Sequence, residues 1–295
     1  MSDKRKIVVG SRDSLLAVTQ SNLVVDYIRK NCPDIDVSLL TMKTTGDIEL
    51  NGPLYNMGGK GLFVKELDIA LMEKRSDLSV HSLKDLPMVV PDDLPIVGFS
   101  KREDPRDVLV LPKGVTEYDG KLPIGCSSLR RILQLETIFP GAEVKNIRGN
   151  LQTRLRKLDE GEFGAIILAA AGLKRLGLED RISRYFDTEE LLPACGQGIL
   201  CLQGRSGEDY SFLKGFLDED ATAQALAERA YVKGVDGGCS SPIAAHAKVS
   251  GDRLELTALF YDENTKKYSK KVMSGPKSDA EKIGQEMADY FLKGI

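Results

Sequence analysis

Arginines follow two neighbouring apolar runs in the middle of the chain. Between Ile124 and Lys157, each run ends at small hydroxyl or amide residues, and then come Arg130 and Arg131 or Arg148 and Arg154. A helix that starts there has unpaired backbone N–H groups and the positive end of its dipole, which favour an anion. Guanidinium groups bind carboxylates and phosphates through paired hydrogen bonds. The spacing therefore predicts a site for a small ligand with several negative charges.

The N-terminal segment Ile7 to Ser14 has the same pattern of strand, glycine, hydroxyl, arginine and helix cap, with Arg12 as its arginine. Any one of these arginines could instead be a solvated surface residue, because that is where most arginines lie. Three strand-turn-helix segments with the same chemistry favour the functional interpretation. A short predicted helix further along adds Lys174 and Arg175 as candidate anion ligands.

A carboxylate and a thiol are the other candidate reactive groups. Asp85 and Lys84 follow a short predicted strand, and ligands of open α/β sheets bind at such strand ends. The alternative for Asp85 is a surface carboxylate paired with Lys84, and for His81 we expect a satisfied buried imidazole. Cys239 follows two glycines in a loop, where another molecule can approach it, and packing is an equally weighted alternative. Cys201, in a predicted strand, is expected to be inert packing.

Composition excludes several classes of protein. The chain has 295 residues, a net charge of -3, no Trp and 6% aromatic residues, so its arginines form local patches on a mildly acidic body. A general nucleic-acid binder would be basic and would offer aromatic stacking surfaces. Five cysteines without a CxxC pair and two histidines predict neither a disulfide framework nor a metal site. We see no secretory signal and no apolar run long enough for a bilayer, which predicts a soluble, cytoplasmic protein.

A glycine-rich segment at residues 43–61 has no periodicity, and we interpret it as a flexible, lysine-bearing flap. Its end resembles a P-loop, but Leu54 stands where the motif needs glycine, and Gly61 stands where it needs Ser or Thr. A phosphate-ester or nucleotide enzyme is therefore a weaker alternative.

The elements that must position these residues alternate between strand and helix, which predicts an α/β fold with mostly parallel, covered sheets. Predicted strands are residues 6–10, 36–42, 78–81, 94–99, 108–111, 122–125, 143–146, 165–168, 199–203, 244–249, 254–260 and 268–273. Predicted helices are residues 14–30, 62–74, 128–139, 151–160, 172–176, 219–233 and 278–293.

Two segments read as crossings between lobes, the charged connector 101–107 and the Pro/Gly segment 191–198. They predict two α/β lobes that can hinge, followed by a small α+β domain. Domain 1 would comprise residues 1–99 and 199–217, with the strand at 199–203 added late. Domain 2 would comprise 104–193, and domain 3 would comprise 218–295 and carry Cys239.

With these residues assembled, the chain resembles the porphobilinogen deaminase (hydroxymethylbilane synthase) family over nearly its whole length. Many motifs in the same order make this resemblance specific. The matching segments are Gly10 to Ala17, Gly58 to Leu67, His81 to Pro87, Ser127 to Arg131, Ile147 to Asn150, Ala171 to Gly177, Pro193 to Gly198 and Gly237 to Cys239.

The resemblance implies two lobes folded like type II periplasmic solute-binding proteins, with the site between them, and a third domain. It implies a transferase that joins four porphobilinogen molecules head to tail, releases ammonia at each step, and gives 1-hydroxymethylbilane for haem-type biosynthesis. A dipyrromethane cofactor would be bound to Cys239 through a thioether. The enzyme would be a monomer, and its product would pass to uroporphyrinogen-III synthase.

The resemblance also implies residue roles. Asp85 would be the catalytic carboxylate, which contacts pyrrole N–H groups, acts as general acid/base in loss of the amine, and stabilises the cationic azafulvene. The cofactor's carboxylates would be held by Lys84, Ser128, Arg130, Arg131 and Arg154. The substrate would be held by Arg12, Arg148 and Arg175, with Ser14, Gln20, Asn150 and Gln197 as hydrogen-bonding neighbours, while Phe63 and the flap would cover the site.

Four residues depart from the commoner family pattern: Cys126 for Thr, Cys195 for Val, Cys201 for Gly and Gln203 for Glu. None removes a charged group with a chemical role, so they bear on packing and redox sensitivity. A non-catalytic solute-binding protein with the same two lobes is the main alternative function. It would need neither Asp85 nor Cys239.

Overall fold

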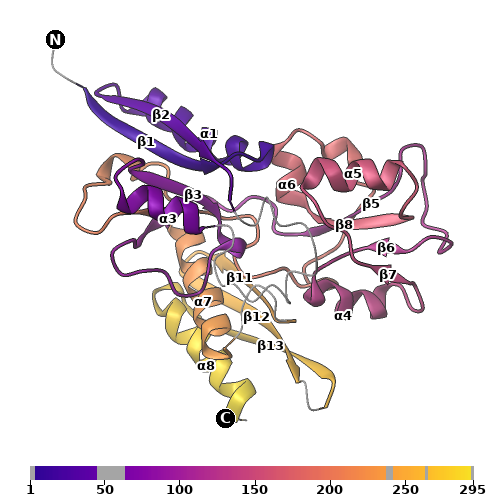
Figure 1. Cartoon of the computed structure of the whole chain (residues 1–295). Helices are drawn as coiled ribbons and strands as arrows, with labels where there is room; N and C mark the ends of the chain where they lie inside the picture. Colours follow the sequence, from indigo (N-terminus) through magenta and orange to yellow (C-terminus); the bar gives the residue numbers. More distant parts are fainter. Residues whose placement is uncertain (1–3, 45–63, 237–241, 263–264, 294–295) are drawn as a thin grey trace. The chain divides into compact units, whose positions relative to one another are not determined.

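The computed structural model describes residues 4–44, 64–236, 242–262 and 265–293 (Figure 1). These residues divide into two compact units, and unit 1 comprises 4–44, 64–102 and 199–222. Unit 2 contains the other described residues. The chain passes between the units after Arg102 and after Gly198, within the two predicted crossings, and again after Thr222, near the start of the predicted third domain. The predicted second domain and all but the first residues of the predicted third domain lie in unit 2, and the boundary between these domains stays a prediction.

Unit 1 contains a five-stranded sheet in the order β2-β1-β3-β10-β4. Its described elements are β1 (Arg5–Arg12), α1 (Leu15–Asn31), β2 (Ile35–Met42), α3 (Lys65–Met72), β3 (Leu78–Ser82), η2 (Leu83–Asp85), β4 (Ile96–Phe99), β10 (Leu200–Gly204) and η4 (Ser211–Leu213). Strand β10 is buried along its whole length, and its apolar run is typical of a central strand. The predicted late strand is therefore confirmed, and Cys201 within it is fully buried.

Helix α1 covers this sheet because its apolar residues recur on one face. Val24, Val25 and Ile28 are completely buried and pack in one core cluster with Ile7 and Val9 of β1. The helix begins where the Ser14 side chain accepts a hydrogen bond from the Ala17 backbone N–H. This entry fixes the position of Arg12, the last residue of β1, at the edge of the sheet.

Unit 2 contains a second five-stranded sheet, in the order β7-β6-β8-β5-β9. Its described elements are β5 (Asp107–Val110), β6 (Ile124–Gly125), α4 (Leu129–Ile138), β7 (Val144–Lys145), α5 (Leu151–Asp159), β8 (Ala165–Ala169), α6 (Ala170–Arg175), η3 (Glu179–Arg181) and β9 (Arg184–Tyr185). The two strand-turn-helix segments expected from the arginine pattern are β6 with α4 and β7 with α5. Strand β9 was not predicted, because Arg184 and Tyr185 do not lie in an apolar run.

Each of these two sheets is mixed but mostly parallel, as predicted, because four of its five strands run in one direction. In unit 1, β1 is parallel to β2 and β3, but β10 is antiparallel to β3 and β4. In unit 2, β6 is parallel to β7 and β8, but β5 is antiparallel to β8 and β9. Both antiparallel strands, β5 and β10, are the first strands after a crossing. The chain enters each sheet there from the other unit, so no βαβ connection forces a parallel direction.

The C-terminal part of unit 2 is an antiparallel sheet of three strands, in the order β11-β12-β13, with two helices. Its elements are α7 (Glu219–Gly234), β11 (Ala244–Ser250), β12 (Arg253–Asp262), β13 (Lys267–Pro276), η5 (Lys277–Asp279) and α8 (Ala280–Lys293). Phe291 of α8 stacks on Phe260 of β12, with ring centroids 5.4 Å apart. The predicted α/β class with two sheet-containing lobes and a small α+β part is confirmed.

Helices α7 and α8 lie side by side (Figure 1) and approach most closely at Gly284. A Cβ atom there would lie 2.2 Å from the Ala227 carbonyl oxygen and 2.7 Å from Cβ of Ala230.

We therefore expect Gly284→Ala to lower the free energy of unfolding by about 1–3 kcal/mol, because the two helix backbones must separate. Urea unfolding checks this. The exposed Glu286→Ala change on the same helix should stay within about 0.5 kcal/mol of the parent chain, and equal effects of both changes would contradict the packing argument.

Candidate active site

The carboxyl ends of β1 and β3 bring three predicted site residues of unit 1, and also Ser82, to one edge of the sheet. Arg12 ends β1, Ser82 ends β3, and Lys84 and Asp85 lie in the 3-10 turn that follows. Because β1 and β3 are parallel, their carboxyl ends meet, and this is where ligands bind in such sheets. A pocket opens here, lined by Arg12, Ala17, Gln20, Val64, Val80, His81, Ser82 and Asp85.

Within this pocket, Gln20 and Ser82 hold each other in place. Nε2 of Gln20 donates to Oγ of Ser82 at 3.0 Å, and Oγ of Ser82 faces Oε1 of Gln20 at 3.3 Å. Asp85 is exposed, whereas Arg12 and Lys84 are half-buried. The pocket thus presents one guanidinium, one carboxylate and a preorganised amide-hydroxyl pair, which suits a ligand with both an anionic group and N–H donors.

His81 lines the same pocket and is buried, as the sequence predicted. Its Nε2 lies 3.0 Å from Oε1 of Gln203, while Nε2 of Gln203 donates to the Leu94 carbonyl at 3.0 Å. The Gln203 amide oxygen therefore faces the imidazole, and Nε2 of His81 is the protonated nitrogen. Burial lowers the pKa of His81 to about 4; the Gln203 hydrogen bond partly opposes this, and the charge of Arg12 adds to it. His81 is neutral at neutral pH.

Asp68 of α3 is a second titrating group near Gln203. Burial raises the pKa of its carboxyl to about 6, and a hydrogen bond with Gln203 partly opposes this rise. Sequence reasoning gave Asp68 no role, and Gln203 was noted only as a departure from a family pattern. No one-dimensional signal joins residues 68, 81 and 203, because the sheet brings them together.

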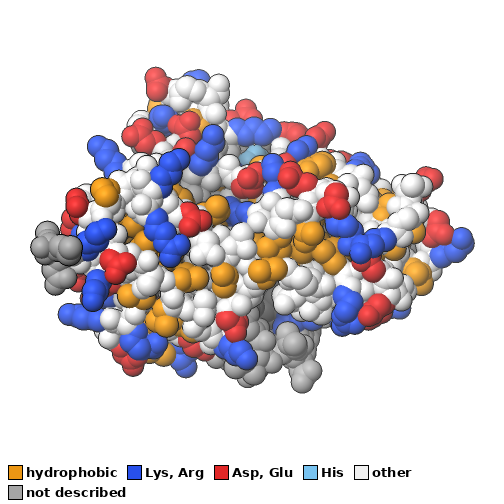
Figure 2. Space-filling view, turned by 90° about the horizontal axis from the view of Figure 1, so that it is seen from above, with side chains coloured by type: hydrophobic (Ala, Val, Ile, Leu, Met, Phe, Trp, Pro, Cys, Tyr) orange, Lys and Arg blue, Asp and Glu red, His pale blue; other side chains and the backbone are white. Residues whose placement is uncertain are grey.

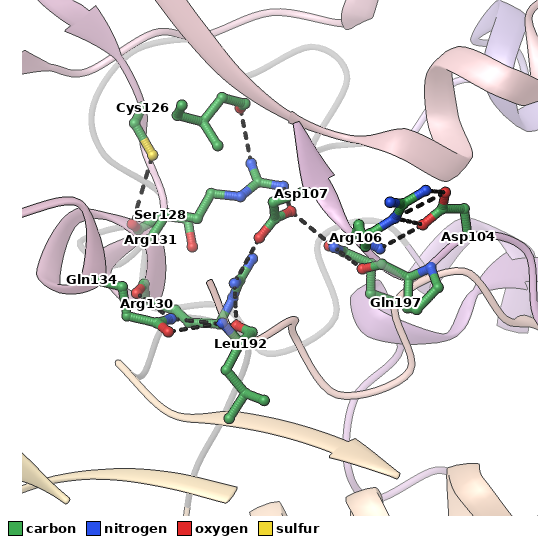
Figure 3. A network of polar contacts seen from close by, with 12 residues as sticks. Asp104, Arg106, Asp107, Cys126, Ser128, Arg130, Arg131, Gln134, Leu192 and Gln197 are labelled. Carbon is green, nitrogen blue, oxygen red and sulfur yellow. Dashed lines mark hydrogen bonds and ion pairs between the residues drawn. The ribbon is translucent and has the colours of Figure 1, made fainter. Parts of the chain in front are cut away.

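In unit 2, Arg130 and Arg131 both reach one buried carboxylate, that of Asp107 (Figure 3). Nη1 of Arg130 lies 2.8 Å from Oδ2 of Asp107, and Nη2 of Arg131 lies 2.6 Å from Oδ1. Burial alone would raise the pKa of Asp107, but the two guanidiniums lower it far below its usual value. Asp107 is fully buried, and it was not predicted as a site residue. The available signal was its place directly before the apolar run at 108–111, because a carboxylate buried with such a run needs a cation or hydrogen-bond donors as partners.

Gln197 joins the same network. Its Nε2 donates to Oδ1 of Asp107 at 2.8 Å and to the Pro105 carbonyl at 2.7 Å. The segment containing Gln197 includes Gly196 and Gly198 at positive φ, +71° and +91°, where a side chain would be strained.

Arg175 of α6 lies beside that segment. Its Nη2 donates to the Gly198 carbonyl at 2.6 Å, and the Glu103 backbone N–H donates to the same carbonyl at 3.0 Å. Burial lowers the pKa of Arg175 to about 10, so the guanidinium stays charged at neutral pH. Lys174 next to it forms an ion pair with Glu103 at 2.9 Å. The two predicted crossings are thus tied together where they enter unit 2.

The start of α5 places the remaining predicted arginines. Asn150 caps this helix through its Oδ1, which accepts from the Thr153 N–H at 2.9 Å, and Nε of Arg154 donates to the Gly149 carbonyl at 2.9 Å. Arg148 and Arg154 are half-buried. Ser128 precedes α4 and its side chain makes no cap hydrogen bond. Cys239, Phe63 and nearly all of the predicted flap lie outside the described residues.

Charged side chains of both signs are interspersed over the face seen in Figure 2, in keeping with the small net charge. Among the described residues, no cluster of His, Cys, Asp and Glu could hold a metal ion. In the same part of the chain, no helix is both long and apolar enough to cross a membrane.

Comparison with known proteins identifies the family. Residues 7–212 match the model described as porphobilinogen deaminase, dipyromethane cofactor binding domain, and residues 222–293 match that of the C-terminal domain. The chain belongs to the porphobilinogen deaminase family. It is therefore a transferase of tetrapyrrole biosynthesis that deaminates and joins porphobilinogen, with a dipyrromethane cofactor. The non-catalytic alternative and the nucleotide-enzyme alternative are both wrong.

Relatives of the same name match nearly end to end. Porphobilinogen deaminase of Acetivibrio thermocellus is 54% identical over 289 residues, which is 98% of this chain and 99% of the relative. That of Alkaliphilus oremlandii is 54% identical and covers 96% of this chain and 95% of its own. That of Methylobacillus flagellatus is 42% identical, covering 98% and 94%.

Solved structures of other proteins resemble the chain more distantly. The periplasmic aliphatic sulphonate binding protein SsuA from Escherichia coli has a TM-score of 0.43 and 11% identity, covering 78% of this chain and 70% of its own. An amino-acid transporter's extracellular binding protein, YtmK from Bacillus subtilis, has a TM-score of 0.43 and 12% identity, covering 78% and 97%. These likenesses are too weak to bear on function.

The buried histidine makes the stability of the fold sensitive to acid. Between pH 6.5 and about 4, the unfolded chain binds a proton at His81 that the folded chain does not, so stability falls as pH falls. We expect this one group to lower the free energy of unfolding by about 3 kcal/mol across that window. His81→Gln should remove this share of the pH dependence, although it also changes stability at pH 7. Urea unfolding of both chains at pH 7 and pH 5 measures it, and an unchanged pH dependence in the variant would contradict the assignment.

Proposed function

We propose that Asp85 is the catalytic carboxylate of this porphobilinogen deaminase. The observation that carries the proposal is the convergence of Arg12 and Asp85 on one pocket at the carboxyl ends of β1 and β3. Porphobilinogen carries acetate and propionate groups, a pyrrole N–H and an aminomethyl group. Arg12 can pair with a carboxylate of the substrate, while Asp85 can accept from the pyrrole N–H.

The reaction needs an anion beside a centre that becomes positive. As the C–N bond of the aminomethyl group breaks, ammonia leaves and positive charge develops on the pyrrole. Asp85 stabilises that charge and acts as general acid/base for the leaving amine and for the proton lost when the next pyrrole has attacked. A neutral His81 in the same pocket adds no opposing positive charge.

Hydrogen bonds of the substrate are assigned to the polar neighbours of Arg12. Gln20 and Ser82 already bond each other, so the Gln20 amide is held in position before a ligand arrives. Ser14 caps α1 beside them. Arg148 and Arg175, with Asn150 and Gln197, are the proposed substrate ligands of unit 2, and Phe63 with the flap is proposed to cover the substrate.

We propose that Lys84, Ser128, Arg130, Arg131 and Arg154 hold the carboxylates of the dipyrromethane cofactor, and that Cys239 binds it through a thioether. The donor set fits such a polyanion. The guanidiniums of Arg130 and Arg131 together bring about ten N–H donors, more than the single Asp107 carboxylate can accept. When bound, the cofactor supplies the pyrrole carbon to which the first substrate is joined.

The oligomeric state, the cellular location and the fate of the product are also part of the proposal. We propose that it acts as a monomer in the cytoplasm and that its linear product passes to uroporphyrinogen-III synthase. A linear tetrapyrrole must be consumed by a ring-closing reaction to reach a macrocycle. Light scattering at micromolar concentration tests the monomer, and a dimer mass would refute it.

The thioether makes a prediction about mass. The intact purified chain should be heavier than its sequence by a two-pyrrole adduct, because the bond survives denaturation. Cys239→Ser should remove the adduct, since a hydroxyl is a far weaker nucleophile than a thiolate. Intact-mass spectrometry measures both proteins, and Cys195→Ser serves as the control that keeps the adduct. An active parent chain of unmodified mass would refute the attachment.

The role of Asp85 makes a prediction about turnover. Asp85→Asn should lower kcat by about 10²–10⁴-fold, because the amide can neither take a proton nor stabilise a cation. The melting temperature should change little, because Asp85 is exposed. The matched change Asp92→Asn, at another exposed aspartate of unit 1, should leave kcat unaltered. Parallel loss of activity and melting temperature in Asp85→Asn would make this residue structural.

A further inference from the structure

The described part of unit 2 holds Asp107, a fully buried carboxylate to which the proposed mechanism gives no task. It is the first residue of β5 and its backbone is fixed on both sides, since the Phe186 N–H donates to the Asp107 carbonyl at 3.0 Å and Asp107 pairs with Ala169 of β8. The carboxylate therefore projects from a rigid strand rather than from a loop (Figure 3). A residue that positions other side chains must itself be held by a rigid backbone.

Two consecutive helix residues converge on this carboxylate. Side chains at neighbouring positions of an α-helix point about 100° apart and do not face each other. Arg130 and Arg131 nevertheless both place a guanidinium nitrogen within 2.8 Å of an Asp107 oxygen. Without the carboxylate between them, two like charges would repel each other at close range. Asp107 is thus the group that allows both guanidiniums to occupy this place.

Each arginine has a second anchor on a different element. Nη1 of Arg130 donates to the Leu192 carbonyl at 2.6 Å, and Nη1 of Arg131 donates to the Ile167 carbonyl of β8 at 3.0 Å. Gln134, one turn along α4, supports the first anchor, because its Oε1 accepts from the Leu192 N–H at 2.8 Å. The orientation of each guanidinium is fixed at two points, and Asp107 is the point that both share.

Stability alone is a poor reason for such a cluster. Taking three charged groups out of water is costly, and buried ion pairs are often no more stabilising than apolar residues of the same size. Fixed geometry is the property that apolar residues could not supply here. We propose that Asp107 is a positioning residue for the cofactor, setting the guanidiniums of Arg130 and Arg131 where the dipyrromethane carboxylates bind. This inference rests on the proposed function, in which those two arginines are cofactor ligands.

The same carboxylate positions Gln197. Oδ1 of Asp107 accepts from Nε2 of Gln197 at 2.8 Å, and the second N–H of that amide goes to the Pro105 carbonyl. Asp107 therefore links the start of α4 with the segment through which the chain leaves unit 2. A change at Asp107 should disturb cofactor binding more than substrate binding at Arg12, which lies in unit 1.

The test compares Asp107→Asn with a matched control, Asp77→Asn. Asp77 of unit 1 also pairs with an arginine, Arg205, at 2.7 Å, and has no proposed role in the reaction. We measure the melting temperature, the fraction of folded protein that carries the two-pyrrole adduct, and the rate at which adduct-free protein acquires it from porphobilinogen. Asp107→Asn should acquire the adduct roughly tenfold more slowly or worse, because its buried partners lose their anion. Asp77→Asn should load like the parent chain despite a lower melting temperature.

The kinetics of the protein that carries the two-pyrrole adduct distinguish a positioning role of Asp107 from a general loss of structure. In Asp107→Asn molecules that do carry the adduct, KM for porphobilinogen should change by a smaller factor than the loading rate does. Asp107 contacts one proposed substrate ligand, Gln197, and the unit 1 pocket with Arg12 is untouched. If Asp107→Asn loads at the rate of Asp77→Asn, the residue is merely structural and the inference is overturned.

A second variant covers a failure to fold. Asp107→Glu keeps the charge but moves the carboxylate by one methylene, so it should fold and still load slowly. Loading at the parental rate would overturn the positioning role. A parent chain that neither carries the adduct nor consumes porphobilinogen would instead refute the proposed function itself, whatever the variants do.

Discussion

A buried guanidinium must be held by an anion or by oriented carbonyl groups, and this requirement organises much of unit 2. Arg130, Arg131 and Arg175 are largely withdrawn from water, and every one of them donates to a main-chain carbonyl. The first two also share the Asp107 carboxylate. Cations held in this way keep their charge while losing their freedom, so little reorganisation is needed when a polyanionic ligand binds.

Unit 1 meets a different requirement in the proposed mechanism, in which positive charge develops in its pocket during the reaction. An exposed carboxylate, Asp85, and one arginine, Arg12, line the pocket with a neutral imidazole. Burial keeps that imidazole neutral by lowering its pKa. The Gln203 amide oxygen accepts from His81 and opposes this only in part, because it carries no charge. A glutamate at residue 203 would bring a negative charge that favours protonation of His81. The residue type at 203 therefore tunes the electrostatics of the pocket without being a proposed ligand.

Local patterns were enough to find most elements. The apolar periodicity of α1, the strand-turn-helix entries at β6 and β7, and the late strand β10 all follow from spacing and cap residues. The antiparallel direction of β5 and β10 did not follow, since these strands run against their neighbours for a topological reason that no local window contains. The candidate site could be predicted only in part. Arg12, Lys84 and Asp85 were predicted from their places at strand ends, but Asp107 and Gln203 looked like an ordinary connector acid and an ordinary strand amide.

The sequence by itself determined the residue types and their local order: arginines after three predicted strands, an aspartate after another, a thiol in a glycine loop, and motifs that place the chain in one enzyme family. Residue types, helix caps and family motifs depend only on residues that are close together in the chain, so the sequence shows them directly. Only the tertiary structure decided which charges share partners. Asp107 meets Arg130, Arg131 and Gln197, and His81 meets Gln203, across separations of 23 to 122 positions. Such pairs form because burial forces each polar group to find a partner, and the fold alone determines which partner is within reach.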